Sequence, residues 1–334
     1  MSAISFFDGH NDILSLTASR PNGWQMFGTS DSSFPINLRD GLSFGYAGGF
    51  FASYQRSEPG VALDQAPARQ GAIAMMSDLI RIEAHSNGAL EIVRSTDDLR
   101  RCVQTGTIAA IQHLEGAEAV DPDLHTLDLF YELGLRSIGP LWSRPNAFGY
   151  GVQTEPPNSV KAGRLGLTAS GLNLVRACNR LGIMIDVSHM NEDGFWDVAR
   201  TSDSPVVATH SNAQAIAPVA RNLTDSQLDA IRDSDGLVGV SFYAGMLRPD
   251  GRADPNTPLD IAVKHIEHIA ERLGLRHVGL GTDFGTATCS SEIHEVSQVP
   301  TLFETLRARG WSEPDLSALG IDNWIRILDL TWRK

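Results

Sequence analysis

Eight short apolar runs of the β-strand type alternate with longer segments of helical periodicity along the chain. The predicted strands cover residues 4–8, 48–54, 108–113, 135–141, 183–187, 205–209, 237–242 and 278–281. The predicted helices cover residues 64–84, 126–133, 168–181, 193–200, 224–234, 258–273 and 298–309. Strands that alternate with helices form parallel sheets, because each helix returns the chain to the same edge. The pattern therefore predicts either an open doubly wound sheet or a closed (β/α)8 barrel.

The closed barrel is the better of these two α/β solutions. Eight is the strand number of a (β/α)8 barrel, and the sequence has no glycine-rich dinucleotide fingerprint. Barrels of this length commonly form one domain, and no linker or repeat divides the 334 residues. We therefore predict a single TIM barrel over residues 1–334. Segments 19–44 and 144–166 are rich in Gly, Pro, Ser and Asn, so we expect them to be long loops.

The charge and cysteine content limit the partners and the compartment. Lys and Arg number 27 against 40 Asp and Glu, a formal net charge of −13, whereas nucleic acids and anionic membranes attract a basic face. We therefore expect no nucleic-acid and no membrane partner, and we find neither a signal-peptide pattern nor a membrane-spanning run. Cys102, Cys178 and Cys289 are too few and too widely spaced for a disulfide framework, which favours a cytoplasmic protein.

Polar side chains follow five of the predicted strands at the point where each strand ends. They are His10 and Asp12 after the first strand, His113 and Glu115 after the third, Asp186 and His189 after the fifth, His210 after the sixth and Asp283 after the eighth. In a barrel the carboxyl ends of all strands meet at one rim, where catalytic groups lie. We therefore expect these side chains to converge, although they are far apart in the sequence.

The residue types at this rim indicate metal binding. His10 and Asp12 lie two positions apart, which places both side chains on one face of an extended strand. His189 and His210 come from adjacent strands and can reach one ion. Imidazole and carboxylate ligands suit zinc, and two such groups on one rim suggest two ions about 3.5–4 Å apart with a bridging carboxylate. Glu115 is the expected bridge, because its strand lies between the two groups.

The remaining histidines give no metal site by sequence. His265 and His268 lie in the middle of an amphipathic helix, so we expect them on its solvated face. We expect the other four to lie at the surface or in loops; they are His85, His125, His277 and His294.

Six motifs occur in a fixed order along the chain: Asp8-Gly9-His10-Asn11-Asp12, Leu114-Glu115-Gly116, Asp186-Val187-Ser188-His189, Thr209-His210-Ser211, Ala220-Arg221-Asn222 and Gly281-Thr282-Asp283-Phe284. This ordered set resembles the renal (membrane) dipeptidase family of zinc metallopeptidases. The resemblance implies a TIM barrel of the metal-dependent hydrolase type with two Zn²⁺ per chain. It also implies hydrolysis of dipeptides by a metal-bound hydroxide, including L-Xaa-D-Xaa substrates in many bacterial members, and a homodimer.

The resemblance also assigns roles to residues. His10 and Asp12 would hold one zinc, His189 and His210 the other, and Glu115 would bridge them. Asp283 would be the catalytic acid/base residue. The substrate-binding residues would be Arg221, which would hold the terminal carboxylate, Asn222 and Trp142.

Two positions depart from the family pattern. Trp142 stands where members often have a histidine that contacts the scissile carbonyl, and an indole cannot titrate. The usual D-F-D-G motif reads Asp283-Phe284-Gly285-Thr286, so its second carboxylate is absent.

Three alternatives remain open on the sequence alone. Lactonases, cyclic amidases and phosphotriesterases use the same barrel, often with a carbamylated lysine as the bridge, whereas the third strand here ends in Glu115. Trp142 is compatible with a disabled barrel that only binds ligands. Arg221 could form a surface salt bridge instead of a carboxylate clamp.

Overall fold

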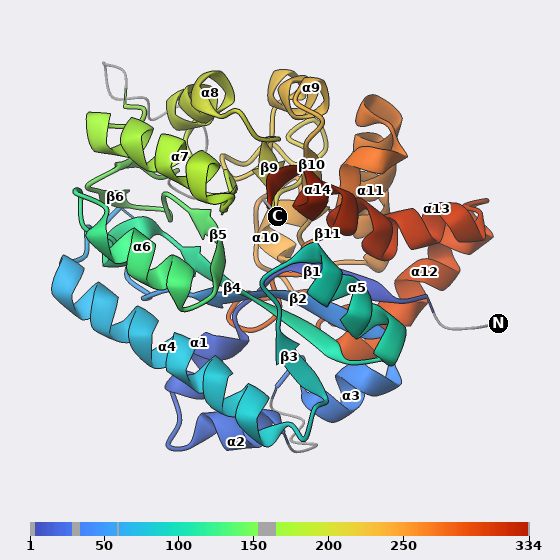
Figure 1. The fold of residues 1–334 in the computed structure, drawn as a ribbon. Coiled ribbons are helices and arrows are strands. Elements are labelled where there is room, and N and C mark those ends of the chain that lie inside the picture. The colour runs from blue at the N-terminus through green and yellow to red at the C-terminus, as the bar shows by residue number, and fades with distance from the viewer. Residues whose placement is uncertain (1–3, 29–33, 59, 153–164, 333–334) are drawn as a thin grey trace.

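Eight parallel strands form a nearly closed barrel in the computed structural model, which describes residues 4–28, 34–58, 60–152 and 165–332 (Figure 1). The strands are β1 (Phe6–Asn11), β2 (Tyr46–Ser53), β4 (Ile108–Glu115), β5 (Leu135–Gly139), β8 (Met184–Ile185), β9 (Val207–Ala208), β10 (Leu237–Val240) and β11 (Val278–Leu280). Their spatial order is β8-β5-β4-β2-β1-β11-β10-β9. A parallel bridge between Asp186 and Val207 joins the two ends of this series. The predicted TIM barrel is therefore confirmed.

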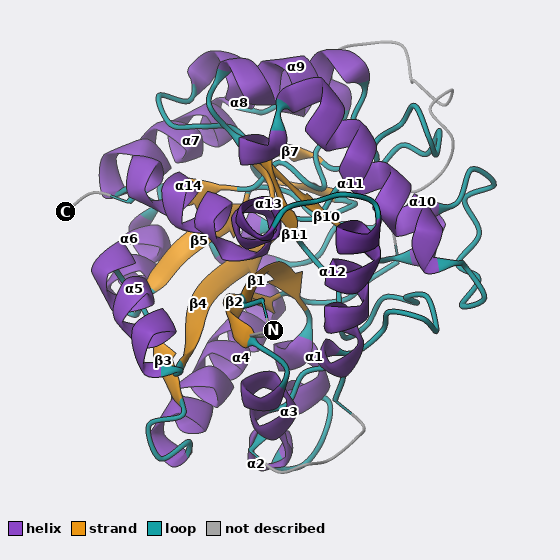
Figure 2. Ribbon diagram, turned by 90° about the vertical axis from the view of Figure 1, so that its right-hand side faces the viewer, coloured by secondary structure: helices purple, strands orange, loops and turns teal. Residues whose placement is uncertain are grey.

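Helices surround the strands on the outside (Figure 2). They are α1 (Ile13–Ala18), α2 (Gly23–Phe27), α3 (Leu38–Ser43), α4 (Gln65–His85), α5 (Thr96–Thr105), α6 (His125–Glu132), α7 (Ala169–Leu181), α8 (Glu192–Thr201), α9 (Asp225–Asp233), α10 (Ala244–Leu247), α11 (Leu259–Leu273), α12 (Val299–Ala308), α13 (Glu313–Ser317) and α14 (Asn323–Thr331). All seven predicted helices form. Three of them, α7, α8 and α9, begin with a side-chain cap; at the start of α9, for example, Thr224 and Gln227 exchange side-chain and backbone hydrogen bonds.

The barrel interior is filled by side chains rather than open. Phe7, Phe50, Ile111 and Met184 point inward and are buried, while a larger apolar layer packs between the strands and the outer helices. Strands buried on both faces explain why the predicted strands are rich in apolar residues and do not alternate regularly between apolar and polar ones.

The C-terminal helix α14 contributes Trp324 to this interior. Asn323 donates hydrogen bonds to the carbonyls of Leu275 and Val278, which places α14 at the end of the barrel where β11 begins. The Trp324 indole then packs against glycines of three strands. A Cβ on Gly9 would lie 2.4 Å from the indole, and one on Gly279 would lie 2.6 Å from it. These positions therefore accept only glycine while Trp324 is in place.

The segments predicted as loops contain regular structure. Residues 19–44 include α2 and α3, the latter started by Asn37, whose side chain accepts from the Asp40 amide. In the segment 144–166, β6 (Pro145–Asn146) pairs with β7 (Gly149–Tyr150), and residues 153–164 lie outside the described residues. The short strand β3 (Leu90–Ile92), which pairs with β4, was not predicted. Among the described residues, no helix is both long and apolar enough to cross a membrane.

Two histidines lie elsewhere than the sequence predicts. His265 is fully buried in α11, where its Nε2 lies 3.0 Å from the Leu247 carbonyl oxygen and its Nδ1 accepts from the Ala213 amide. His277 is also buried, with its Nδ1 2.8 Å from the Gly236 carbonyl oxygen. The solvated-face prediction for His265 is therefore wrong, because the end of α10 and the segment at Ala213 supply hydrogen-bond partners to this face of the helix.

Candidate metal centre

The five predicted ligands come together at one rim of the barrel. Their ligand atoms form two groups, within each of which all atoms lie no more than 4.8 Å apart. The first group is His10, Asp12 and Glu115, and the second is Glu115, His189 and His210. Glu115 belongs to both groups, which is the position that a bridging carboxylate requires.

The distances show how closely the ligand atoms approach. Glu115 Oε1 lies 2.9 Å from His189 Nε2, 3.5 Å from His210 Nε2 and 3.6 Å from His10 Nε2. His10 Nε2 lies 3.6 Å from Asp12 Oδ1, and the Nε2 atoms of His189 and His210 are 3.1 Å apart. Four of these side chains are buried, and that of His189 is only 10% exposed. The ligand atoms therefore face one another in a small space shielded from solvent.

Hydrogen bonds behind the centre fix the ring orientation of two ligands. Thr209 Oγ1 donates to Asp186 Oδ2 at 2.6 Å, so it has no proton left for His210, whose Nδ1 lies 2.8 Å away. His210 Nδ1 must therefore be the donor, and its Nε2 presents a lone pair to the centre. Ser143 Oγ lies 2.8 Å from His189 Nδ1 and orients that ring in the same way. Such second partners are typical of metal-binding histidines.

The polar atoms of the first group fit a metal ion. Both ring nitrogens of His10 and Asp12 Oδ1 are buried and have no hydrogen-bond partner in the described part of the chain. Buried polar atoms normally pair with other polar groups or with metals, because leaving them unpaired costs free energy. Imidazole nitrogens and carboxylate oxygens of this kind are the ligands that zinc and similar divalent ions bind.

The charge balance of the centre also favours a cation. Burial lowers the pKa of His189 and His210, so both rings are neutral and able to bind a metal. Burial raises the pKa of Glu115, against the opposing charge of His10. Burial alone would lower the pKa of His10, but Glu115 and Asp12 raise it to about 10. The buried carboxylates of Glu115 and Asp12 thus favour a protonated His10 ring. A divalent ion bound beside them would neutralise the same negative charge.

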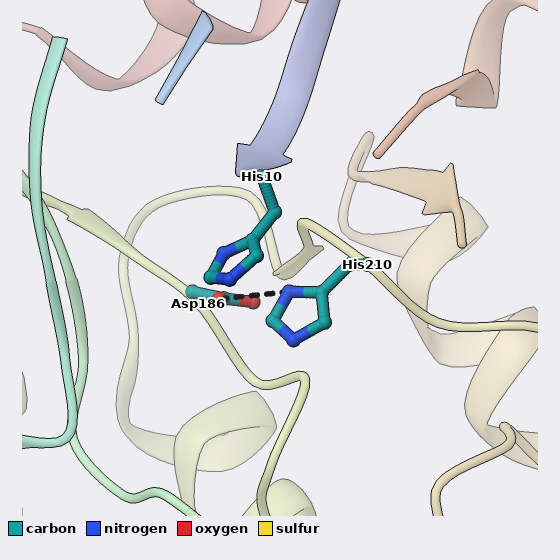
Figure 3. A group of neighbouring side chains, drawn as sticks. All are labelled: His10, Asp186 and His210. Carbon is teal, nitrogen blue, oxygen red and sulfur yellow. Dashed lines mark ion pairs between the residues drawn. The ribbon is translucent and has the colours of Figure 1, made fainter. Parts of the chain in front are cut away.

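A third group of possible ligands consists of His10, Asp186 and His210 (Figure 3). Asp186 Oδ2 lies 3.9 Å from His210 Nδ1. However, the Asp186 carboxylate already accepts from the amides of Ser188 and Thr209 and from both of their hydroxyls. Asp186 therefore orients Thr209 and, through it, His210. The sequence places Asp186 at the rim but does not reveal this role.

The predicted acid/base residue also lies at the rim. Asp283 follows β11 and adopts a φ of 64°, a left-handed conformation that is uncommon for a residue other than glycine. Its Oδ2 accepts from Ser241 Oγ at 3.2 Å, and burial raises the pKa of its carboxyl group.

Arg221 is buried and points into the centre. Its Nη1 donates to the Ser188 carbonyl, and its Nη2 lies 3.1 Å from His189 Nε2. The alternative of a surface salt bridge is therefore wrong. A metal bound at His189 Nε2 would use the lone pair that faces Arg221 Nη2. The Nη2 hydrogens would then be available to another acceptor, such as a substrate carboxylate.

The other two predicted substrate-binding residues differ in their placement. Trp142 stacks on the His189 ring, with centroids 5.6 Å apart and planes inclined by 25°. Asn222 instead donates to the carbonyls of Ala217 and Met246, so its amide nitrogen holds the backbone and is not available to a ligand.

Three residues around the centre have no role assigned from the sequence. His113, which the strand pattern places at the rim, packs edge-on against His10 with ring centroids 5.6 Å apart, and its Nδ1 lies 2.9 Å from Ser137 Oγ. Tyr54 and Thr286 hydrogen-bond each other beside Asp12. Tyr54 is the last residue of the second predicted strand, and Thr286 follows the Asp283 motif. Their positions at strand ends were the signal that could have placed both residues at the rim.

A (β/α)8 barrel with imidazole and carboxylate ligands at this rim defines the class of metal-dependent hydrolases. Within that class, the model of the family described as membrane dipeptidase (peptidase family M19) matches residues 1–331. The chain therefore belongs to this family of metallo-dipeptidases, hydrolases that act on peptide bonds.

Individual relatives agree with this membership. A Klebsiella pneumoniae protein, called "Uncharacterized protein in pqqA 5'region", is 46% identical over 262 residues, which cover 78% of this chain and 95% of that protein. Dipeptidase 3 of Rattus norvegicus is 29% identical over 332 residues, which cover 96% of this chain and 64% of that protein. A metallo peptidase from Rhodobacter sphaeroides, crystallised with a phosphinate mimic of the dipeptide L-Ala-D-Ala, matches with a TM-score of 0.93 and 40% identity over 99% of this chain and 100% of that one.

Proposed function

We propose that this chain is a binuclear zinc dipeptidase whose substrates include L-Xaa-D-Xaa dipeptides. The observation that carries the proposal is the double membership of Glu115, whose carboxylate lies in both groups of possible metal ligands. His10 and Asp12 would hold one ion, and His189 and His210 would hold the other. Two divalent ions would polarise the scissile carbonyl and lower the pKa of a bound water.

The protein's own residues would orient the dipeptide and move the proton. Asp283, which lies at the same rim, would accept a proton from the attacking water at its carboxylate and pass it to the nitrogen of the leaving amine. The products are then a free amino acid and a second amino acid with a new carboxylate, so one water is consumed for each amide bond cut.

Arg221 would limit the length of the substrate. Its guanidinium points toward His189 from a buried position, so a terminal carboxylate bound there leaves room for one residue beyond the scissile bond. The stereochemical part of the proposal is supported by the similarity to the Rhodobacter sphaeroides enzyme, which was crystallised with a mimic of L-Ala-D-Ala.

The alternative is another binuclear amidohydrolase on the same barrel. Phosphotriesterase-like and cyclic-amidase sites often use a carbamylated lysine as the bridge, and the bridging position here is a glutamate. Two further predictions stay untested: that the protein is a homodimer, which light scattering of the purified protein would measure, and that it is located in the cytoplasm.

The direct test is a substrate panel with the zinc-reconstituted protein. Amine release should be measured for dipeptides with L- and D-residues at each end, their C-terminally amidated forms and tripeptides, and acid release should be measured for a lactone and a dihydropyrimidine, whose ring opening frees no amine. We expect turnover of free dipeptides, including those with a D-residue at the C-terminus, and little turnover of the others. Preferred turnover of the lactone or the cyclic amide would contradict the proposal.

A further inference from the structure

The chain segments that follow β1 and β11 run side by side at the rim. The Asp12 amide donates to the Phe284 carbonyl at 2.8 Å, and the Asp283 amide donates to the His10 carbonyl at 3.0 Å. The residues just after Phe284 are therefore held next to Asp12, whose carboxylate belongs to the first metal-ligand group.

Gly285 stands where the D-F-D-G pattern has its second carboxylate. Its φ is 135°, and a Cβ at this position would lie 2.6 Å from Asp12 Cβ. A side chain here would therefore push Asp12 away from the centre. The next residue, Thr286, supplies the polar contact instead, since its Oγ1 donates a short hydrogen bond to Asp12 Oδ2.

The direction of the hydrogen bonds beyond Thr286 follows from counting protons. A threonine hydroxyl has one proton, and the contact with the Asp12 carboxylate uses it. Tyr54 Oη lies 3.0 Å from Thr286 Oγ1, so Tyr54 must be the donor in that bond. The order of donation is thus Tyr54 to Thr286 to Asp12, and each bond strengthens the next.

This arrangement leaves one oxygen of Asp12 for the centre. Oδ2 is held by Thr286, whereas Oδ1 faces His10 Nε2 at 3.6 Å and has no hydrogen-bond partner among the described residues. Tyr54 is itself held by stacking on Trp142, with ring centroids 6.0 Å apart. The two hydroxyls therefore fix the rotation of the Asp12 carboxylate.

We propose that Thr286 and Tyr54 are positioning residues that orient Asp12 toward the metal site formed with His10 and Glu115. The inference rests on the proposed function, because it requires an ion at that site. Partners behind a metal ligand typically change metal affinity by about 10–100-fold. We therefore expect loss of the Thr286 hydroxyl to weaken the ion at Asp12 by about that factor, and to leave the ion at His189 and His210 nearly unchanged.

The test is a titration of the metal-free protein with Co²⁺ and Zn²⁺, followed by the absorption of bound cobalt and by chelator competition. Thr286→Val should weaken one of the two binding steps, and Thr286→Ser, which keeps the hydroxyl, should restore it. Tyr54→Phe keeps the ring but removes the donor, so it should weaken the same step by a smaller factor. Thr331→Val is the matched control, because Thr331 is also a buried threonine but its hydroxyl donates to the Ile327 carbonyl of its own helix.

The outcomes separate this inference from the proposed function. If the unmodified protein binds two ions and Thr286→Val binds both with the same affinities, the positioning role is wrong and the proposed function stands. If the unmodified protein does not bind two ions, both proposals are wrong. If Thr286→Val does not fold, Tyr54→Phe decides, and unchanged binding of both ions by that variant overturns the inference.

Discussion

Asp283 shows how a single backbone conformation serves the centre. Its φ of 64° costs an aspartate about 1–3 kcal/mol, a strain that persists only where the surroundings hold it. Here the Asp283 amide donates to the His10 carbonyl, and the next amide, of Phe284, donates to Thr282 Oγ1. The chain therefore turns at Asp283 and keeps its carboxylate at the rim beside the metal ligands.

We predict that Asp283→Asn retains the metal ions and loses most of the turnover. An amide has nearly the same shape as the carboxylate but cannot accept and pass on the proton, and positioned acid/base groups contribute about 10²–10⁴-fold. Steady-state kinetics together with metal analysis would measure both effects. A variant with nearly normal kcat would refute the acid/base role.

For Arg221, we predict that Arg221→Met lowers kcat/KM for free dipeptides by the equivalent of about 1.5–3 kcal/mol, the size of a charged hydrogen bond. C-terminally amidated dipeptides, which have no carboxylate to bind, should be poor substrates of both proteins. Arg100→Met is a suitable control, because Arg100 is exposed and forms its ion pair with Asp329, which is not one of the residues of the candidate centre. Equal turnover of amidated and free dipeptides by the unmodified enzyme would exclude the clamp.

At the scale of elements, α14 supports the barrel from the end opposite the candidate centre. Trp324 is fully buried, packs against glycines of β1 and β11, and donates from Nε1 to the Leu280 carbonyl at 3.1 Å. Its neighbours Phe7 and Phe50 fill the layer below His10 and His113. Helix α14, which is not part of the (β/α)8 repeat, therefore completes the apolar interior beneath the rim.

We predict that Trp324→Ala lowers the free energy of unfolding by about 3–5 kcal/mol, as usual for truncation of a large buried aromatic residue. Leu330→Ala on the same helix is the control. Leu330 is 49% exposed, so its loss should change stability by no more than about 0.5 kcal/mol. Urea denaturation would measure both, and equal effects of the two changes would show that Trp324 does not support the barrel.

The predicted elements were those with strong local patterns. The eight barrel strands are short runs rich in apolar residues, and the seven predicted helices have capping residues or clear periodicity. Trp324, Ile327 and Leu328 also have helical spacing, but the burial of Trp324 inside the barrel depends on glycines of distant strands. His265 was misplaced for the same reason, because its partners Leu247 and Ala213 come from other parts of the chain. Local patterns predict an element, whereas its partners depend on the assembled fold.

At the scale of the whole molecule, the order of strands in the barrel explains why the candidate ligands could be predicted. Every strand of the barrel is parallel to its neighbours, so each strand end carries its polar residues to the same rim, and the order of the strands gives the neighbours. The residues behind the ligands had no comparable signal. Ser143, Thr209 and Thr286 are ordinary hydroxyl residues in the sequence, and only the folded chain shows which ligand each one contacts.

The central claim is that Glu115 joins two metal ions in one site, and metal analysis of the reconstituted protein tests it most directly. We expect about two divalent ions per chain in the unmodified protein. Glu115→Gln should bind fewer, because a neutral amide is a poor bridge between two cations. One ion or none in the unmodified protein, or two equally tight ions in Glu115→Gln, would contradict the account.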